Sequence, residues 1–171
     1  MKTNVNSWAL FLLLIIVQLV MTNYLPLSQF VTLSLLPALI MCLPMTMPTF
    51  LLMVVAFATG MTVDFLAEGV VGLNTLALVP VAAMRNFVVG IVAGQDTVER
   101  GADFNFKKNG PVKVATIVAI PLAVFLLIFI AADGAGMRPF WFNLVRFTAS
   151  LLVDLAIGMG VVKLLNPDDR R

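Results

Sequence analysis

Charge is scarce in this sequence, and histidine is absent. Only 12% of the 171 residues are charged, whereas 61% are hydrophobic and the mean hydropathy is +1.04. A typical soluble domain is about half apolar and about a quarter charged. A soluble fold of this length could not bury so much apolar surface. The composition therefore excludes an ordinary soluble domain and predicts an integral membrane protein.

The missing residue types also exclude most catalytic chemistry. The absence of histidine removes the commonest general base and the commonest transition-metal ligand. The single cysteine, Cys42, cannot form an internal disulfide and is interpreted as a small buried hydrophobe. The sequence has no P-loop, no zinc-ligand spacing and no Ser/His/Asp set. We therefore expect no catalytic residue, cofactor or metal, and a protein that is not an enzyme.

Six apolar runs approach the length that a bilayer requires, which is about 20 residues for a helix. They predict one all-α membrane domain over residues 1–171. The predicted spans are residues 8–24, 30–43, 49–65, 70–93, 112–132 and 140–165. The second run is short, and we expect Pro37 to bend it.

The basic residues lie at the ends of the apolar runs, so membrane topology explains them better than nucleic-acid binding does. Six spans place both termini on one side of the membrane. With that side cytoplasmic, only Arg138 among the basic residues outside the spans faces outward. The residues that then face inward are Lys2, Arg100, Lys107, Lys108, Lys113, Lys163, Arg170 and Arg171. We predict both termini inside, membrane lipid as surroundings and no nucleic-acid partner.

Ionisable side chains within spans are costly and usually face the bundle interior. Four are present: Asp64, Arg85, Arg146 and Asp154. Counting about 1.5 Å per helical residue places Asp64 and Arg146 toward the outer ends of their spans. The same count places Arg85 and Asp154 toward the inner ends. We therefore predict two ion pairs, Asp64 with Arg146 and Arg85 with Asp154. Matched depth favours a structural lock, and the alternative is a pocket lining or a proton path.

Polar and small residues mark one face of two of the spans. A stripe spaced by three or four residues runs along the sixth span and comprises Asn143, Arg146, Ser150, Asp154 and Gly158. In the third span, Ala56, Gly60 and Asp64 form a small-residue face suited to close helix contact. We infer central packing of the third, fourth and sixth spans.

The longest polar connection, residues 94–111, carries alternating charges with phenylalanines between them. It is either a solvated loop whose phenylalanines dip into the membrane interface or a docking site for a cytoplasmic partner. The candidate partner residues are Glu99, Arg100, Phe104, Phe106, Lys107 and Lys108.

One stretch resembles a known family. Gly60-Met-Thr-Val-Asp64, followed by Gly72-Leu73-Asn74-Thr75-Leu76, resembles the centre of MreD, the rod-shape-determining membrane protein of bacteria. That family typically has a Gly-x-x-x-Asp segment followed shortly by a Gly-Leu segment that opens the next helix. The family motif would be carried by Gly60, Asp64 and Gly72.

The resemblance implies a non-catalytic inner-membrane subunit of the cell-elongation machinery. MreD is thought to associate with MreC and to work with the MreB filament, the RodA glycosyltransferase and its transpeptidase partner in lateral peptidoglycan synthesis. The family's fold is similar to the six-helix substrate-binding subunits of energy-coupling-factor vitamin transporters. Fold alone does not give function.

Two other functions remain as alternatives. A substrate-binding transporter subunit predicts a pocket that opens outward near Asp64 and Asn74, and Phe140, Trp141 and Phe142 could line it or form an interfacial belt. An intramembrane aspartyl protease requires two carboxylates that share a proton. The predicted depths separate Asp64 from Asp154, and the GxGD pattern of that family is missing.

The predicted topology can be tested by labelling. A cysteine introduced by Asn109→Cys should react with a membrane-impermeant thiol reagent only from the cytoplasmic side. The parent chain, with Cys42 alone, is the control. Reaction from the outer side of intact cells would overturn the orientation.

Overall fold

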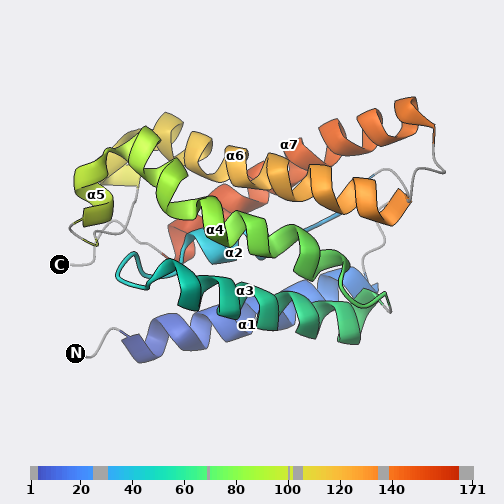
Figure 1. Cartoon of the computed structure of the whole chain (residues 1–171), viewed down its shortest axis with the longest axis horizontal. Helices are drawn as coiled ribbons and strands as arrows, with labels where there is room; N and C mark the ends of the chain where they lie inside the picture. The colour runs from blue at the N-terminus through green and yellow to red at the C-terminus, as the bar shows by residue number, and fades with distance from the viewer. Residues whose placement is uncertain are drawn as a thin grey trace.

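Apolar helices make up most of the part of the chain that the computed structural model describes, which is residues 4–24, 31–68, 70–99, 101, 106–134 and 139–165 (Figure 1). The long helices are α1 (Asn4–Tyr24), α3 (Thr49–Val63), α4 (Leu73–Ala93), α6 (Phe106–Gly134) and α7 (Phe140–Leu165). Two helices are short, α2 (Leu36–Met41) and α5 (Gln95–Glu99), and a π-helical turn, η1 (Asp64–Glu68), continues α3. The predicted all-α class is confirmed.

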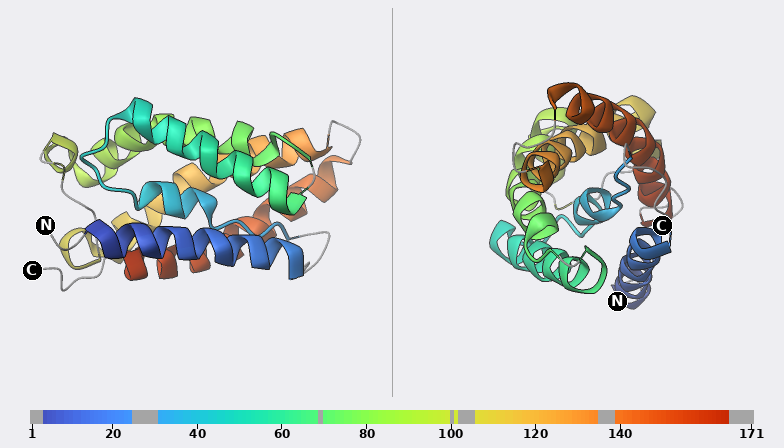
Figure 2. Two further views of the ribbon diagram at one scale, coloured as in Figure 1. Left: turned by 90° about the horizontal axis from the view of Figure 1, so that it is seen from below. Right: turned by 90° about the vertical axis from the view of Figure 1, so that its right-hand side faces the viewer.

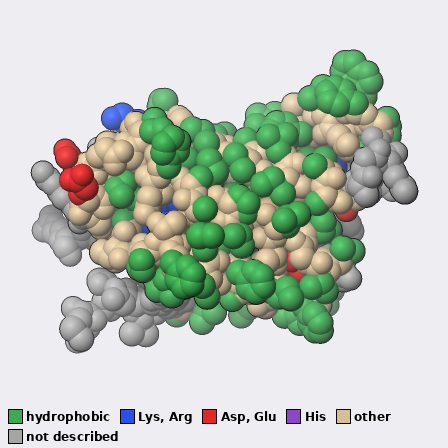
Figure 3. Space-filling model, viewed as in Figure 1, with side chains coloured by type: hydrophobic (Ala, Val, Ile, Leu, Met, Phe, Trp, Pro, Cys, Tyr) green, Lys and Arg blue, Asp and Glu red, His purple; other side chains and the backbone are tan. Residues whose placement is uncertain are grey.

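Four of these helices are long and apolar enough to cross a membrane: Thr49–Ala67, Leu73–Ala93, Asn109–Asp133 and Phe140–Leu165. The shortest has 19 residues, which at about 1.5 Å per residue reaches roughly the thickness of the hydrocarbon core. In α1, Ala9–Tyr24 is a shorter apolar helix. Large apolar side chains cover much of the outer surface (Figure 3). The fold is compatible with a multi-pass membrane protein.

The prediction of a second spanning helix over residues 30–43 is wrong. Within that range the structure has only the six residues of α2, about 9 Å of helix, preceded by non-helical chain over residues 32–35. Pro37 does not bend a long helix but lies at the start of a short one. Proline is tolerated there because its missing N–H would have no partner in the first turn.

The core of the bundle is built around α2. Figure 2 shows this helix enclosed by the long helices when the bundle is viewed from its end, and it packs against α1, α3, α4, α6 and α7. All six of its residues are buried, and the Leu39 side chain is 0% exposed. A helix that is apolar on every side belongs in a core. The second apolar run therefore fills the centre of the protein instead of facing lipid.

The helices at the two ends of the chain point to one end of the bundle. α1 begins and α7 ends at the end that carries α5 (Figure 1). The placement of both termini on one side of a membrane, and the assignment of that side to the cytoplasm, stay predictions. α3 packs against α4 as expected, but α7 packs against α6, α2 and α1 and contacts neither α3 nor α4. The inferred central packing of the third, fourth and sixth spans is therefore wrong.

The central position of α2 predicts an asymmetry between two leucines. Leu39→Ala should lower the free energy of unfolding by about 2–5 kcal/mol because the enclosed site cannot collapse. Leu152→Ala is the matched control because the Leu152 side chain is 71% exposed on α7, and its loss should stay within about 0.5 kcal/mol. Unfolding of the purified protein in detergent measures both. Equal losses would contradict the enclosed position of α2.

Candidate functional site

The carboxylate of Asp64 caps the start of the helix that follows it. Asp64 lies where α3 passes into η1 and is 0% exposed. Its oxygens accept five hydrogen bonds, from the backbone N–H groups of Gly72 (3.0 Å), Asn74 (2.8 Å) and Thr75 (3.1 Å) and from the side chains of Asn74 (3.0 Å) and Thr75 (2.8 Å). The first N–H groups of a helix lack partners within the helix, and an anion is favoured there. The carboxylate thus locks α3 to α4.

Two glycines make this joint sterically possible. A Cβ added at Gly60 would lie 2.7 Å from the Cα of Thr75, so only glycine lets α3 approach α4 this closely. Gly72 has φ 105°, a left-handed conformation that glycine adopts without strain. The residues named for the family motif, Gly60, Asp64 and Gly72, therefore come together in one joint. Sequence reasoning gave Thr75 no role, although its hydroxyl donates to Asp64 from the first turn of α4.

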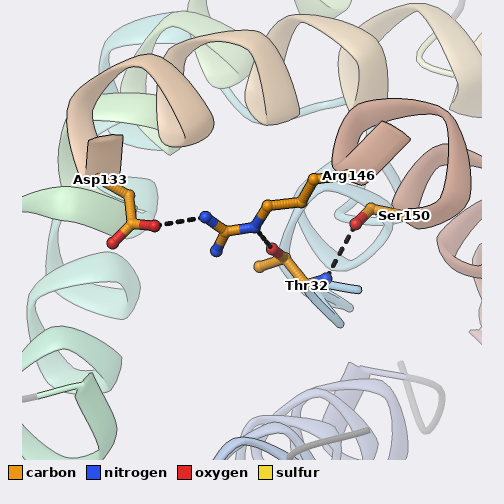
Figure 4. A network of polar contacts seen from close by, with 4 residues as sticks. All are labelled: Thr32, Asp133, Arg146 and Ser150. Carbon is orange, nitrogen blue, oxygen red and sulfur yellow. Dashed lines mark hydrogen bonds and ion pairs between the residues drawn. The ribbon is translucent and has the colours of Figure 1, made fainter. Parts of the chain in front are cut away.

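Arg146 does not pair with Asp64, contrary to prediction. Its guanidinium forms an ion pair with Asp133 at the end of α6 and donates to the Thr32 hydroxyl at 2.8 Å (Figure 4). Matched depth was a poor guide because it ignores which helices are neighbours. α6 and α7 pack side by side, whereas α3 and α7 do not touch.

Arg85 and Asp154 are also not paired with each other, so the second predicted ion pair is wrong. The buried Arg85 guanidinium donates to the carbonyl oxygen of Leu43 at 2.6 Å and contacts the Met45 sulfur. Asp154 accepts from the backbone N–H of Ser34 at 3.1 Å. Both partners belong to the chain on either side of α2, which lies between α4 and α7.

The non-helical segment 31–35 is held by side chains from α1 and α7, which we call the polar clamp: Gln18, Ser150 and Asp154. Ser150 Oγ accepts from the Thr32 N–H at 2.8 Å, and Asp154 accepts from Ser34. Gln18 accepts from the Leu35 N–H at 2.7 Å and donates to the Leu33 carbonyl at 3.2 Å. Backbone groups away from water need such partners because non-helical chain has none of its own.

The polar stripe predicted on the last span faces this segment. Arg146, Ser150 and Asp154 all bond to residues 32–34, and Gly158 lies against Ala38, whose Cβ is 3.3 Å from a Cβ added at the glycine. Gln18 was missed by sequence reasoning. The available signal was its position as the one polar residue between Trp8 and Thr22.

The candidate partner loop is described only in part. Glu99 lies on α5 and is exposed. Arg100 and Phe104 lie outside the described residues, and Phe106, Lys107 and Lys108 begin α6 with side chains that are not described. Docking at this loop stays a prediction.

The described residues contain no group of three or more Cys, Asp or Glu side chains that could hold a metal ion. A groove of about 400 Å³ is apolar and lies between α6 and α7, away from Asp64. It is lined by Pro111, Val112, Ala115, Thr116, Ala119 and Leu155. Phe140 and Trp141 are both 74% exposed and pack edge to face, as an interfacial belt would.

Comparison with protein-family models, with curated proteins and with solved structures finds no match. The functional proposal therefore rests on the joint between α3 and α4 and on the motif residues Gly60, Asp64 and Gly72 that form it.

The observed ion pair can be tested by a double-mutant cycle. Asp133→Asn and Arg146→Gln should be non-additive, with a coupling of about 0.5–3 kcal/mol in the free energy of unfolding, because the groups touch. The matched cycle of Asp64→Asn with Arg146→Gln should be additive within about 0.5 kcal/mol. Coupling confined to the second cycle would restore the pairing expected from depth.

Proposed function

We propose that this chain is a non-catalytic component of the bacterial cell-elongation machinery in the inner membrane. It scaffolds lateral peptidoglycan synthesis and maintains cell shape, as an MreD-like protein would. The observation that carries this proposal is the joint between α3 and α4. Gly60, Asp64 and Gly72, the residues on which the resemblance depends, have one shared physical role there. A motif that works as a unit is better support than three separate matches.

The packing of the centre favours a scaffold over a transporter subunit. A subunit that encloses a small molecule needs a concave site, whereas α2 lies in the middle of this bundle with every residue buried. The pocket expected near Asp64 and Asn74 has little support, because both side chains are buried and bonded to each other. Because α2 occupies the centre of the bundle, the outer surface is the part of the protein that can bind partners.

Two regions of that surface suit partner proteins. The lipid-facing sides of the long helices can receive transmembrane helices, as expected for association with MreC and, through it, with MreB, RodA and the elongation transpeptidase. Acidic side chains are visible at the end that carries α5 (Figure 3), and Asp96 and Glu99 on α5 are exposed. They are available to a cytoplasmic protein.

The proposal is tested by isolating the tagged chain from native membranes in a gentle detergent and identifying its partners by mass spectrometry. We expect MreC, RodA or the elongation transpeptidase to be enriched over a tagged polytopic control protein of similar size. Depletion of the chain should turn rod-shaped cells round. Recovery of a transporter's membrane coupling subunit and its ATPases, with unchanged cell shape, would overturn the proposal in favour of a substrate-binding subunit.

A further inference from the structure

Asp154 is a buried acid that has only one hydrogen bond. Its side chain is 2% exposed, and Oδ1 accepts from the Ser34 N–H at 3.1 Å. The other oxygen, Oδ2, is buried and has no hydrogen-bond partner. The hydroxyl oxygen of Ser34, on the residue that Asp154 already contacts, is likewise buried without a partner. Two unused oxygens therefore belong to one contacting pair of residues.

No cationic side chain compensates Asp154 from the elements packed against α7. These elements are α6, α2 and α1. α1 and α2 contain no charged residue, and their nearest titratable groups are Tyr24 at the end of α1 and Cys42 after α2. α6 has its lysines, at 107, 108 and 113, near one end and Asp133 at the other.

The other charges in the described part of the spanning helices are also accounted for. On α7 itself, Arg146 lies about two turns before Asp154 and forms an ion pair with Asp133. Lys163 is exposed near the C-terminal end of α7. Arg85 is on α4, which does not pack against α7. An ionised Asp154 would therefore have no described cation on the elements that pack against it.

The other two described carboxyls of the spanning bundle differ sharply from Asp154. Asp64 is equally buried but accepts five hydrogen bonds at a helix N-terminus. Asp133 forms an ion pair with Arg146. Both settings stabilise the anion. A buried carboxylate without such compensation neutralises itself instead.

We propose that Asp154 is a proton-binding site at the centre of the bundle, where it is a neutral carboxylic acid at neutral pH. Oδ1 accepts from the Ser34 backbone, and Oδ2, which has no hydrogen-bond partner, carries the proton. The polar clamp on segment 31–35 thus carries no net charge at Asp154. Loss of this proton would require water or a cation to enter between α7 and that segment. This inference goes beyond the proposed scaffold and does not depend on it.

The test is infrared spectroscopy of the full chain in lipid bilayers, with aspartate carboxyls labelled with ¹³C. A protonated acid has a carbonyl band that is distinct from carboxylate bands and shifts when the proton is exchanged for deuterium. We expect this band in the wild-type protein at neutral pH and its loss in Asp154→Asn. Asp133→Asn is the matched control and should keep the band. Absence of the band from the wild type, or its persistence in Asp154→Asn, would overturn the proposal.

Two further measurements keep the test decisive. Ser34→Ala removes a hydroxyl from the residue whose N–H bonds to Asp154 and should shift the band, which assigns it to Asp154 even if Asp154→Asn fails to fold. Loss of the band when sodium chloride replaces choline chloride at constant pH would show that a metal cation neutralises the carboxylate, and would overturn the proposal.

The accumulated level of protein gives a separate prediction. Asp154→Asn should accumulate as the wild type does, because an amide has the shape of the neutral acid. Asp64→Asn should accumulate less, because an amide nitrogen would face hydrogen-bond donors.

Discussion

The structure depends on one constraint, which is that every backbone amide and carbonyl in an apolar interior needs a hydrogen-bond partner. Segment 31–35 is non-helical and passes through the bundle beside α1 and α7. It satisfies the constraint with side chains from those helices. Gln18, Ser150 and Asp154 supply the missing partners, and α2 can then occupy the centre. The positions of the polar residues on α7 follow from this requirement.

Three aspartates show how much the setting of a carboxyl decides its role. Asp64 is an anion that joins two helices through the start of α4, and Asp133 is an anion paired with Arg146. Asp154 has one backbone donor and no cation on the helices around it. Depth in the membrane does not separate these cases, because each depends on which N–H groups and which helices are adjacent. The joint at Asp64 supports the proposed scaffold, whereas Asp154 raises a separate question of proton occupancy.

Hydropathy predicted the parts of the fold that face lipid along their length. The spans expected at 49–65, 70–93 and 140–165 correspond closely to α3 with η1, to α4 and to α7. The run at 30–43 was misread because an apolar segment looks the same in sequence whether it faces lipid or protein. The ion pairs failed for a related reason: counting residues gives depth but not which helices pack together. Gln18 is a lone amide in an apolar run, which indicates a buried polar contact. The sequence pattern did not indicate that its partner is the backbone of segment 31–35.

The clamp on segment 31–35 also constrains how the protein is made. Two of the side chains that hold the segment, Ser150 and Asp154, lie more than 100 positions later in the sequence, on α7. α2 is too short to be inserted as a spanning element by itself. Two of the hydrogen bonds that hold segment 31–35 can therefore form only after α7 has been synthesised. A chain truncated before α7 lacks these two groups of the polar clamp.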